Sequence, residues 1–181
     1  FDHLASTLIG NSVNQTFTMY TGDGRNGKSV MISLMAKVLG DYKVEVPLSL
    51  VADKQRTKVG GVSPEIVSLK GARYAVMNEP SKHDRLNEGK MKELTSGKDP
   101  ITCRAPYMTG MVSFVPQATF AVACNVMMEV DSNDGGTWRR IRIAPFQSYF
   151  TENPVDNDPN KPYQFPVDCE IENKFDRWKE V

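Results

Sequence analysis

Apolar positions along the chain follow two different spacings, one typical of helices and one typical of buried strands. Between residues 28 and 39 they stand three or four positions apart, which predicts a helix with one buried face, and Gly40 stands where a left-handed C-terminal cap is expected. The run 119–124 is apolar apart from Thr119, as in a strand covered on both faces of a sheet. The helix is predicted to bury Val30, Met31, Leu34, Met35, Val38 and Leu39.

Shorter patterns predict the remaining regular elements. Further strands are predicted at 16–20, 73–77 and 140–146, and a hairpin at 101–115. Short helices are predicted at 63–71, where a proline follows a serine cap, and at 87–96.

The ends of the chain and one internal stretch have less regular patterns. Residues 1–9 have the pattern of the last turns of an amphipathic helix closed by Gly10, so we expect them to end a helix of a longer protein. Residues 41–62 are polar and mixed, which predicts a mobile loop. Residues 151–166 are rich in Pro, Asn and Asp, which predicts a surface excursion before a helical segment at 170–179.

Composition limits the class of protein. The 181 residues, 40% of them hydrophobic, suffice for one sizeable core. The 22 basic and 22 acidic residues cancel, which excludes a histone-like basic wrapper and leaves only a local patch for nucleic acid. Three cysteines without metal-ligand spacing favour a reducing, intracellular compartment. No apolar run approaches the roughly 20 residues that cross a bilayer, so we expect a soluble protein with no membrane partner.

The strongest chemical signal is a glycine-rich loop between a predicted strand and a predicted helix. It matches the template of the phosphate-binding loop, in which backbone N–H groups and a helix N-terminus surround an anion. Lys28 would reach the outer phosphates, and the Ser29 hydroxyl would ligate magnesium. The alternative is a glycine-rich turn without a ligand. The residues of the loop are Gly22, Asp23, Gly24, Arg25, Asn26, Gly27, Lys28 and Ser29.

Two polar residues follow strands that should end at the same sheet edge as this loop. Glu79 comes after the strand 73–77 and is the candidate acid for magnesium or the attacking water. Asn125 comes after the strand 119–124 and could hold a water against the γ-phosphate. Either residue could instead belong to an ordinary turn, because both types are common there.

Three arginines lie within four positions near the last predicted strand. An arginine finger offers a planar, permanently charged fork to the transition state of phosphoryl transfer. If the stretch is a strand, Arg140 and Arg142 share one face and Arg139 lies on the other. A solvated basic edge strand is the alternative.

With these elements in this order, the sequence resembles superfamily 3 helicases of the large-DNA-virus and phage primase-helicase type, which include the poxvirus primase-helicase. The resemblance runs from residue 1 to about 146. Its motifs are Gly-Asp-Gly-Arg-Asn-Gly-Lys-Ser at 22–29, Asn-Glu-Pro at 78–80, Lys-Glu-Leu-Thr-Ser-Gly-Lys-Asp-Pro-Ile-Thr-Cys-Arg-Ala at 92–105, Ala-Cys-Asn at 123–125 and Asp-Gly-Gly-Thr-Trp-Arg-Arg-Ile-Arg at 134–142.

The resemblance implies an α/β fold, a P-loop NTPase with an AAA+-like three-layer core and a central, mostly parallel sheet. It implies ATP or another NTP with Mg²⁺ as cofactors, a homo-hexameric ring, single-stranded DNA and other replication proteins as partners, and action inside the host cell of a virus or phage. Glu79 would polarise water, Asn125 would sense the γ-phosphate, and Arg139 or Arg140 would reach the neighbour's site. The domains would be the end of a helical collar at 1–15, the ATPase core at 16–150 and a C-terminal excursion and helix at 151–181.

Two departures from the family pattern change the expected site. A single acid after the strand 73–77 leaves magnesium mostly to Ser29 and water. The hairpin tip lacks the lysine that such helicases often carry, so Arg104 and Tyr107 become the nearest DNA contacts. Two other classes of function also fit a phosphate loop, a small-molecule kinase and an assembly module that binds nucleotide without turnover.

Overall fold

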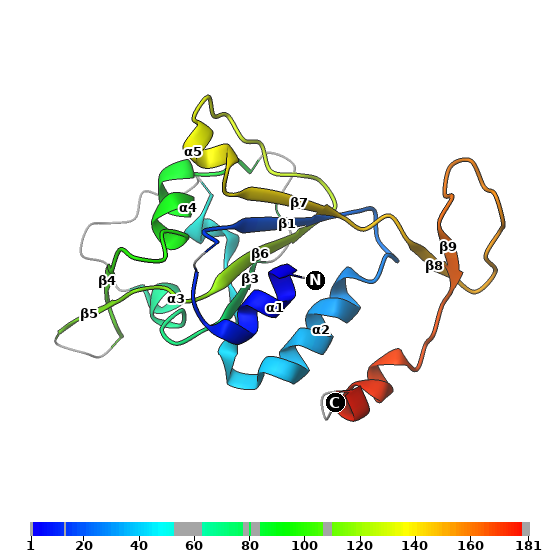
Figure 1. Ribbon diagram of the computed structural model, residues 1–181, viewed down its shortest axis with the longest axis horizontal. Helices are drawn as coiled ribbons and strands as arrows, with labels where there is room; N and C mark the ends of the chain where they lie inside the picture. The colour runs from blue at the N-terminus through cyan, green and yellow to red at the C-terminus, as the bar shows by residue number, and fades with distance from the viewer. Residues whose placement is uncertain are drawn as a thin grey trace.

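A five-stranded parallel sheet forms the centre of the protein in a computed structural model that describes residues 2–12, 14–52, 63–77, 80, 84–106 and 110–178 (Figure 1). Its strand order is β2-β3-β6-β1-β7, with β1 (Phe17–Thr21) between β6 (Thr119–Cys124) and β7 (Ile141–Pro145). The other strands of the sheet are β2 (Lys43–Val46) and β3 (Tyr74–Met77). All four strand pairs are parallel, so the carboxyl ends of the strands share one edge.

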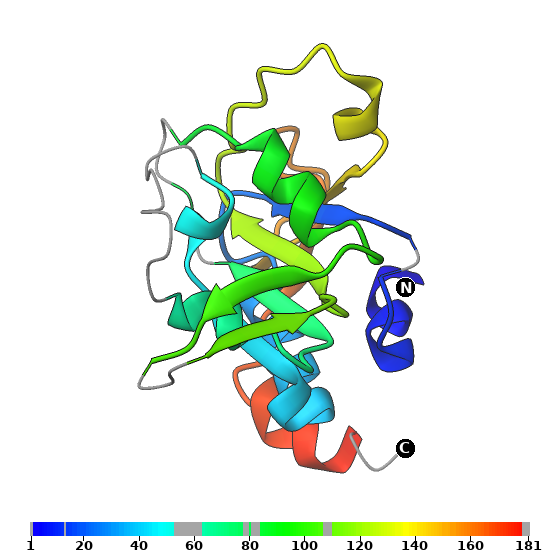
Figure 2. The same cartoon turned by 90° about the vertical axis from the view of Figure 1, so that its left-hand side faces the viewer.

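Helices cover both faces of this sheet, which gives three layers (Figures 1 and 2). On one face, α1 (Asp2–Ile9) and α2 (Lys28–Leu39) pack on a cluster that includes Tyr20 and Tyr74. On the other face, α4 (Glu88–Leu94) contributes Met91 to the main core. The alternation of side chains along a strand explains the split, since Phe17 and Met19 face the main core while Tyr20 faces α2.

The described helices and strands agree with most of the predicted elements. Helix α2 has the predicted bounds, and α1 ends before Gly10, whose φ of 69° is the expected left-handed conformation. The hairpin is antiparallel, with β4 (Ile101–Arg104) paired to β5 (Met111–Phe114). Helix α3 (Pro64–Val67) is shorter than predicted but begins at the proline.

Three predictions were wrong in detail. Residues 41–52 are not one mobile loop, because Lys43–Val46 form edge strand β2 and Leu48–Leu50 a short 3-10 helix, η2. Val38 is 44% exposed although Met35 and Leu39 on either side of it are buried, because successive helix positions are turned by about 100° and Val38 lies beside the buried stripe. The cap at Gly40 has φ 53° and ψ −126°, outside the left-handed helical region, because the chain continues into the 3-10 helix η1 (Gly40–Tyr42).

The C-terminal segment is more closely joined to the core than a surface excursion. It contains a two-stranded parallel pair, β8 (Tyr149–Thr151) with β9 (Gln164–Pro166), followed by η3 (Ile171–Lys174) and α6 (Phe175–Trp178). Phe175 is buried, and Lys37 of α2 forms an ion pair with Asp176 at 2.9 Å. In Figure 1 this orange and red segment passes the end of β1 and returns along α2.

Among the described residues, none of the helices has the length and apolar character that a membrane span requires. The division into collar, core and C-terminal part stays a prediction.

Candidate functional site

The loop between β1 and α2 adopts a backbone conformation that depends on its glycines. Gly22 has φ 148°, and a Cβ there would lie 2.6 Å from the carbonyl oxygen of Phe146. Gly27 has φ 85° immediately before the first residue of α2. Both conformations are rare for residues with a side chain, so these glycines let the loop turn tightly into the helix N-terminus. That is the backbone arrangement with which phosphate-binding loops surround an anion.

Lys28 and Asn26 turn their polar groups into this loop. Lys28 is 8% exposed, and its Nζ donates to the carbonyl oxygen of Gly22. Asn26 is 5% exposed, its Oδ1 accepts from the backbone N–H of Lys28 at 3.4 Å, and its Nδ2 has no hydrogen-bond partner in the described part of the chain. A buried ammonium and a buried amide donor therefore stand at the loop, where each could donate a hydrogen bond to an anion.

Asn125 lies beside the loop because β6 is the immediate neighbour of β1. The register pairs Thr21 with Cys124, so the residue after each strand comes to the same edge. The Asn125 Oδ1 lies 3.4 Å from Lys28 Nζ. The structure therefore brings together the loop lysine and the predicted γ-phosphate sensor, whose role stays a prediction.

Of the two predicted metal ligands, Ser29 lies in the described part of the chain and Glu79 does not. Ser29 is exposed in the first turn of α2, at the mouth of the loop. Glu79 lies outside the described residues, as does Tyr107 of the hairpin tip. No cluster of three His, Cys, Asp or Glu side chains suited to a metal occurs in the described ranges. This donor set fits Mg²⁺, which needs few protein ligands because it keeps waters and binds phosphate oxygens.

The candidate arginine fingers lie at the opposite edge of the sheet. The carbonyl oxygen of Arg140 accepts from the N–H of Phe17, at the amino end of β1, whereas the loop follows its carboxyl end. Five strand residues span roughly 16 Å, beyond the reach of an arginine side chain. Arg139 and Arg140 therefore cannot contact a nucleotide held by the loop of the same chain.

The arginine stretch also differs from the predicted strand. Strand β7 begins at Ile141, and α5 (Gly135–Trp138) precedes the arginines. Arg139 is exposed and its Nη2 donates to Gln15 Oε1 at 3.2 Å. Arg140 folds back so that its Nη1 donates to the carbonyl oxygen of Gly136 at 3.0 Å. The strand starts one residue later than predicted, so Arg142 alone of the three arginines lies within β7.

A polar network that the sequence did not reveal joins α4 to α5. Glu88 Oε2 accepts from the hydroxyls of Ser132 and Thr137, each at 2.7 Å. Lys92 bridges Glu88 and Asp134, and Asp134 caps α5 by accepting from Gly136 N–H. The Thr137 and Ser132 hydroxyls lower the pKa of Glu88, and Lys92 lowers that of Asp134. The spacing of Glu88 and Lys92 was visible in the sequence, but their partners 42 to 49 residues away were not.

Arg104, the other predicted DNA contact, ends strand β4. Its side chain is exposed, and its carbonyl oxygen accepts from Ser63 N–H at 3.2 Å. The hairpin and α5 lie on the side of the sheet away from β8 (Figure 1). The structure thus separates this residue from the glycine-rich loop.

Comparison with known proteins identifies relatives among large DNA viruses. No family model matches the chain. The chain is 32% identical over 176 residues to "Putative helicase 022R" of Frog virus 3 and 34% identical over 182 residues to "Putative helicase L207/L206" of Acanthamoeba polyphaga mimivirus, covering 96% and 98% of this chain. It is 31% identical over 163 residues to "Putative primase C962R" of African swine fever virus, covering 90%. The resemblance to helicases and primases of such viruses is confirmed.

The chain spans less than a fifth of the length of these relatives, 18%, 19% and 16% respectively. Among solved structures, the apo C-terminal region of NrS-1 is similar with a TM-score of 0.64 and 14% identity, over 98% of this chain and 38% of that one. That likeness concerns the fold, and it confirms the predicted α/β core with a mostly parallel central sheet, typical of P-loop NTPases.

Proposed function

We propose that this chain is the ATPase motor of a superfamily 3 replicative DNA helicase, part of a primase-helicase that acts inside the infected host cell. The observation that carries the proposal is the convergence of Lys28, Asn26 and Asn125 on a glycine loop at the carboxyl edge of a parallel sheet. The homology to viral helicases and primases supports a role in genome replication.

In this proposal, Lys28 leaves the Gly22 carbonyl and binds the outer phosphates, while the loop N–H groups hold the β-phosphate. Glu79 takes a proton from water as the water oxygen attacks the γ-phosphorus. The bond between the γ-phosphorus and the oxygen that bridges it to the β-phosphate breaks, which releases ADP and phosphate. Asn125 orients that water. Mg²⁺, held by Ser29 and Glu79, would neutralise charge on the phosphate oxygens.

In this proposal, hydrolysis depends on assembly because of the arginines. Because Arg139 and Arg140 lie at the far edge of the sheet from their own loop, they can act only on a neighbour's nucleotide, as in a homo-hexameric ring. The hairpin β4–β5 would follow single-stranded DNA through the channel, with Arg104 and Tyr107 as its contacts. Other replication proteins are further expected partners.

The test is nucleotide hydrolysis with and without single-stranded DNA. Stimulation by DNA that disappears in Lys28→Ala and Glu79→Gln is the expected result. Normal turnover by Glu79→Gln would remove the proposed base. Phosphate transfer to a small acceptor without DNA stimulation would favour a kinase, and nucleotide binding without any turnover would favour an assembly module.

A further inference from the structure

An apolar cavity of about 420 Å³ lies directly beside the glycine-rich loop. Gly27 of the glycine-rich loop and Val30 of α2 line one side, and Val30 directly follows the predicted magnesium ligand Ser29. The opposite walls come from the C-terminal segment. They include Phe150, Pro166, Val167, Cys169 and Ile171.

The volume lies within the range of about 300–1,000 Å³ typical of sites for small ligands.

Backbone hydrogen bonds hold these walls against the loop. The N–H of Phe150 donates to the carbonyl oxygen of Arg25 at 2.7 Å, and the N–H of Val167 donates to that of Thr151 at 2.9 Å. The Phe150 ring lies 3.3 Å from where a Cβ on Gly27 would stand. The segment is therefore fixed to the phosphate loop itself, so whatever binds the loop is adjacent to the cavity.

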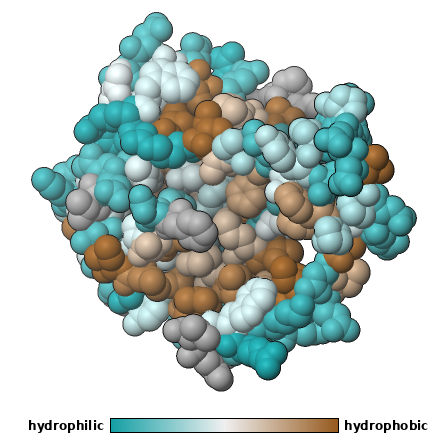
Figure 3. Space-filling model, turned by 45° about the vertical axis from the view of Figure 1, so that its right-hand side comes forward, coloured by the Kyte–Doolittle hydropathy of each residue, from teal (hydrophilic) through white to brown (hydrophobic). Residues whose placement is uncertain are grey.

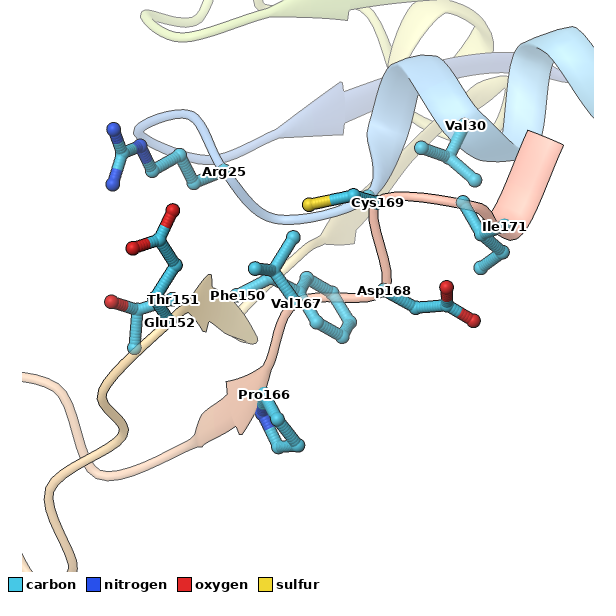
Figure 4. A pocket seen from close by; sticks show the side chains of 11 residues that line it. Arg25, Val30, Phe150, Thr151, Glu152, Pro166, Val167, Asp168, Cys169 and Ile171 are labelled. Atoms are coloured by element: carbon cyan, nitrogen blue, oxygen red, sulfur yellow. The ribbon is translucent and has the colours of Figure 1, made fainter.

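The inner walls of the cavity are mostly apolar and carry few hydrogen-bonding side chains. Figure 4 shows Val30 and Ile171 on one side of Cys169 and Phe150 and Val167 on another, with the Cys169 sulfur pointing away from Val30 and Ile171. Asp168 points away, because its carboxylate accepts from Glu170 N–H and pairs with Lys174. The side of the molecule that carries this segment exposes hydrophobic surface between hydrophilic residues (Figure 3).

Two of the three charged side chains of the lining lie at one rim, while the third, Asp168, points away. Arg25 and Glu152 are both exposed and lie together at one side of the space (Figure 4). Charges in contact with water discriminate weakly between ligands, since water competes for their hydrogen bonds.

We infer that this cavity receives the nucleobase of the bound nucleotide and grips it by stacking and apolar contact without reading its hydrogen-bonding edge. The inference rests on the proposed nucleotide site and adds its base specificity. A flat base has apolar π-faces of the kind that stack on Phe150. Strong discrimination needs buried polar groups that an incorrect base would leave unpaired, and the inner side chains Val30, Phe150, Val167 and Ile171 offer none. Purine and pyrimidine nucleoside triphosphates should therefore bind within about tenfold of one another.

Cys169 provides a native reporter for this cavity. It is exposed, whereas Cys103 and Cys124 are buried, so N-ethylmaleimide should label Cys169 first. Labelling, followed by mass spectrometry, is compared without ligand, with ATP, GTP, CTP or UTP, and with inorganic tripolyphosphate. The nucleoside triphosphates should slow labelling at least tenfold. Tripolyphosphate should bind the loop, measured by calorimetry, yet leave the labelling rate unchanged because it has no base.

A filling variant tests the same point without a reagent. Cys169→Trp should weaken ATP binding at least tenfold and leave tripolyphosphate binding unchanged. Val155→Trp, at an exposed position of the same segment outside the cavity lining, is the matched control and should bind ATP as the wild type does.

ATP binding that leaves Cys169 labelling unchanged, or normal ATP affinity in Cys169→Trp, would overturn the cavity assignment while the phosphate site stands. Protection by ATP alone, with CTP and UTP bound over a hundredfold more weakly, would overturn base tolerance. Absence of both ATP and tripolyphosphate binding would overturn the proposed function together with this inference.

Discussion

The separation of the arginines from the loop of their own chain makes a mixing experiment decisive. Lys28→Ala removes the phosphate contact of a subunit but leaves its arginines, and Arg140→Ala does the reverse. Each variant alone should lose hydrolysis, since an arginine supplied in trans is worth about 10³–10⁵ in rate. Arg139→Ala is tested in the same way, because either arginine could face the neighbouring subunit.

Random assembly of the two variants determines how much hydrolysis should return. In an equal mixture, a site works only when the subunit with an intact Lys28 is followed by a neighbour with an intact arginine. Each condition is met in half of the cases, so about one quarter of the wild-type rate should return if sites in the heterologous ring act independently. A steady-state phosphate-release assay on the assembled protein, with DNA present, measures this fraction across mixing ratios.

The control mixture contains Lys28→Ala and the double variant Lys28→Ala/Arg140→Ala, which share no intact loop and should stay inactive at every ratio. If neither arginine variant recovers activity with Lys28→Ala, while both still assemble, action in trans is wrong. If Arg140→Ala alone keeps the wild-type rate, Arg140 is not the finger. Arg139 would then be the remaining candidate.

Three further predictions follow from single residues. Gly22→Ala should destabilise the fold by about 2–3 kcal/mol in urea unfolding, because its Cβ would meet the Phe146 carbonyl, while Gly71→Ala, with φ 82° and open space, should cost about 1 kcal/mol. Asn125→Ala should lower kcat about 10²-fold with nucleotide affinity retained, unlike exposed Asn133→Ala. Burial lowers the pKa of His3 from 6.5 to about 4, so the unfolded chain takes up the extra proton at a higher pH than the folded chain does. Stability should fall by at most about 3 kcal/mol as pH drops from 6.5 to 4, and His3→Gln should remove this dependence.

The fold was predictable where the sequence pattern is local and strong. The buried strand β6 and helix α2 show their period directly, because their apolar side chains face continuous layers. Edge strand β2 was missed because Lys43 and Glu45 alternate with two valines over four residues, a pattern that polar loops also show. Helix α5 was missed because its glycines disfavour a helix; the cap hydrogen bond to Asp134 and the tertiary hydrogen bond from Thr137 to Glu88 compensate.

The residues of the site likewise fall into two groups, those predictable from local sequence and those brought together by distant contacts. A phosphate loop is recognisable because eight consecutive residues carry its whole chemistry, and Asn125 could be added because parallel strands bring their ends to one edge. The apolar cavity could not be predicted, since its walls combine Val30 with residues 120 to 141 positions later, which long-range pairing of β8 with β9 and of Phe150 with Arg25 brings near. Its residues look like ordinary loop residues in sequence. The motif thus predicts binding of the charged phosphates of a nucleotide, whereas selectivity for the base depends on contacts that exist only in the folded chain.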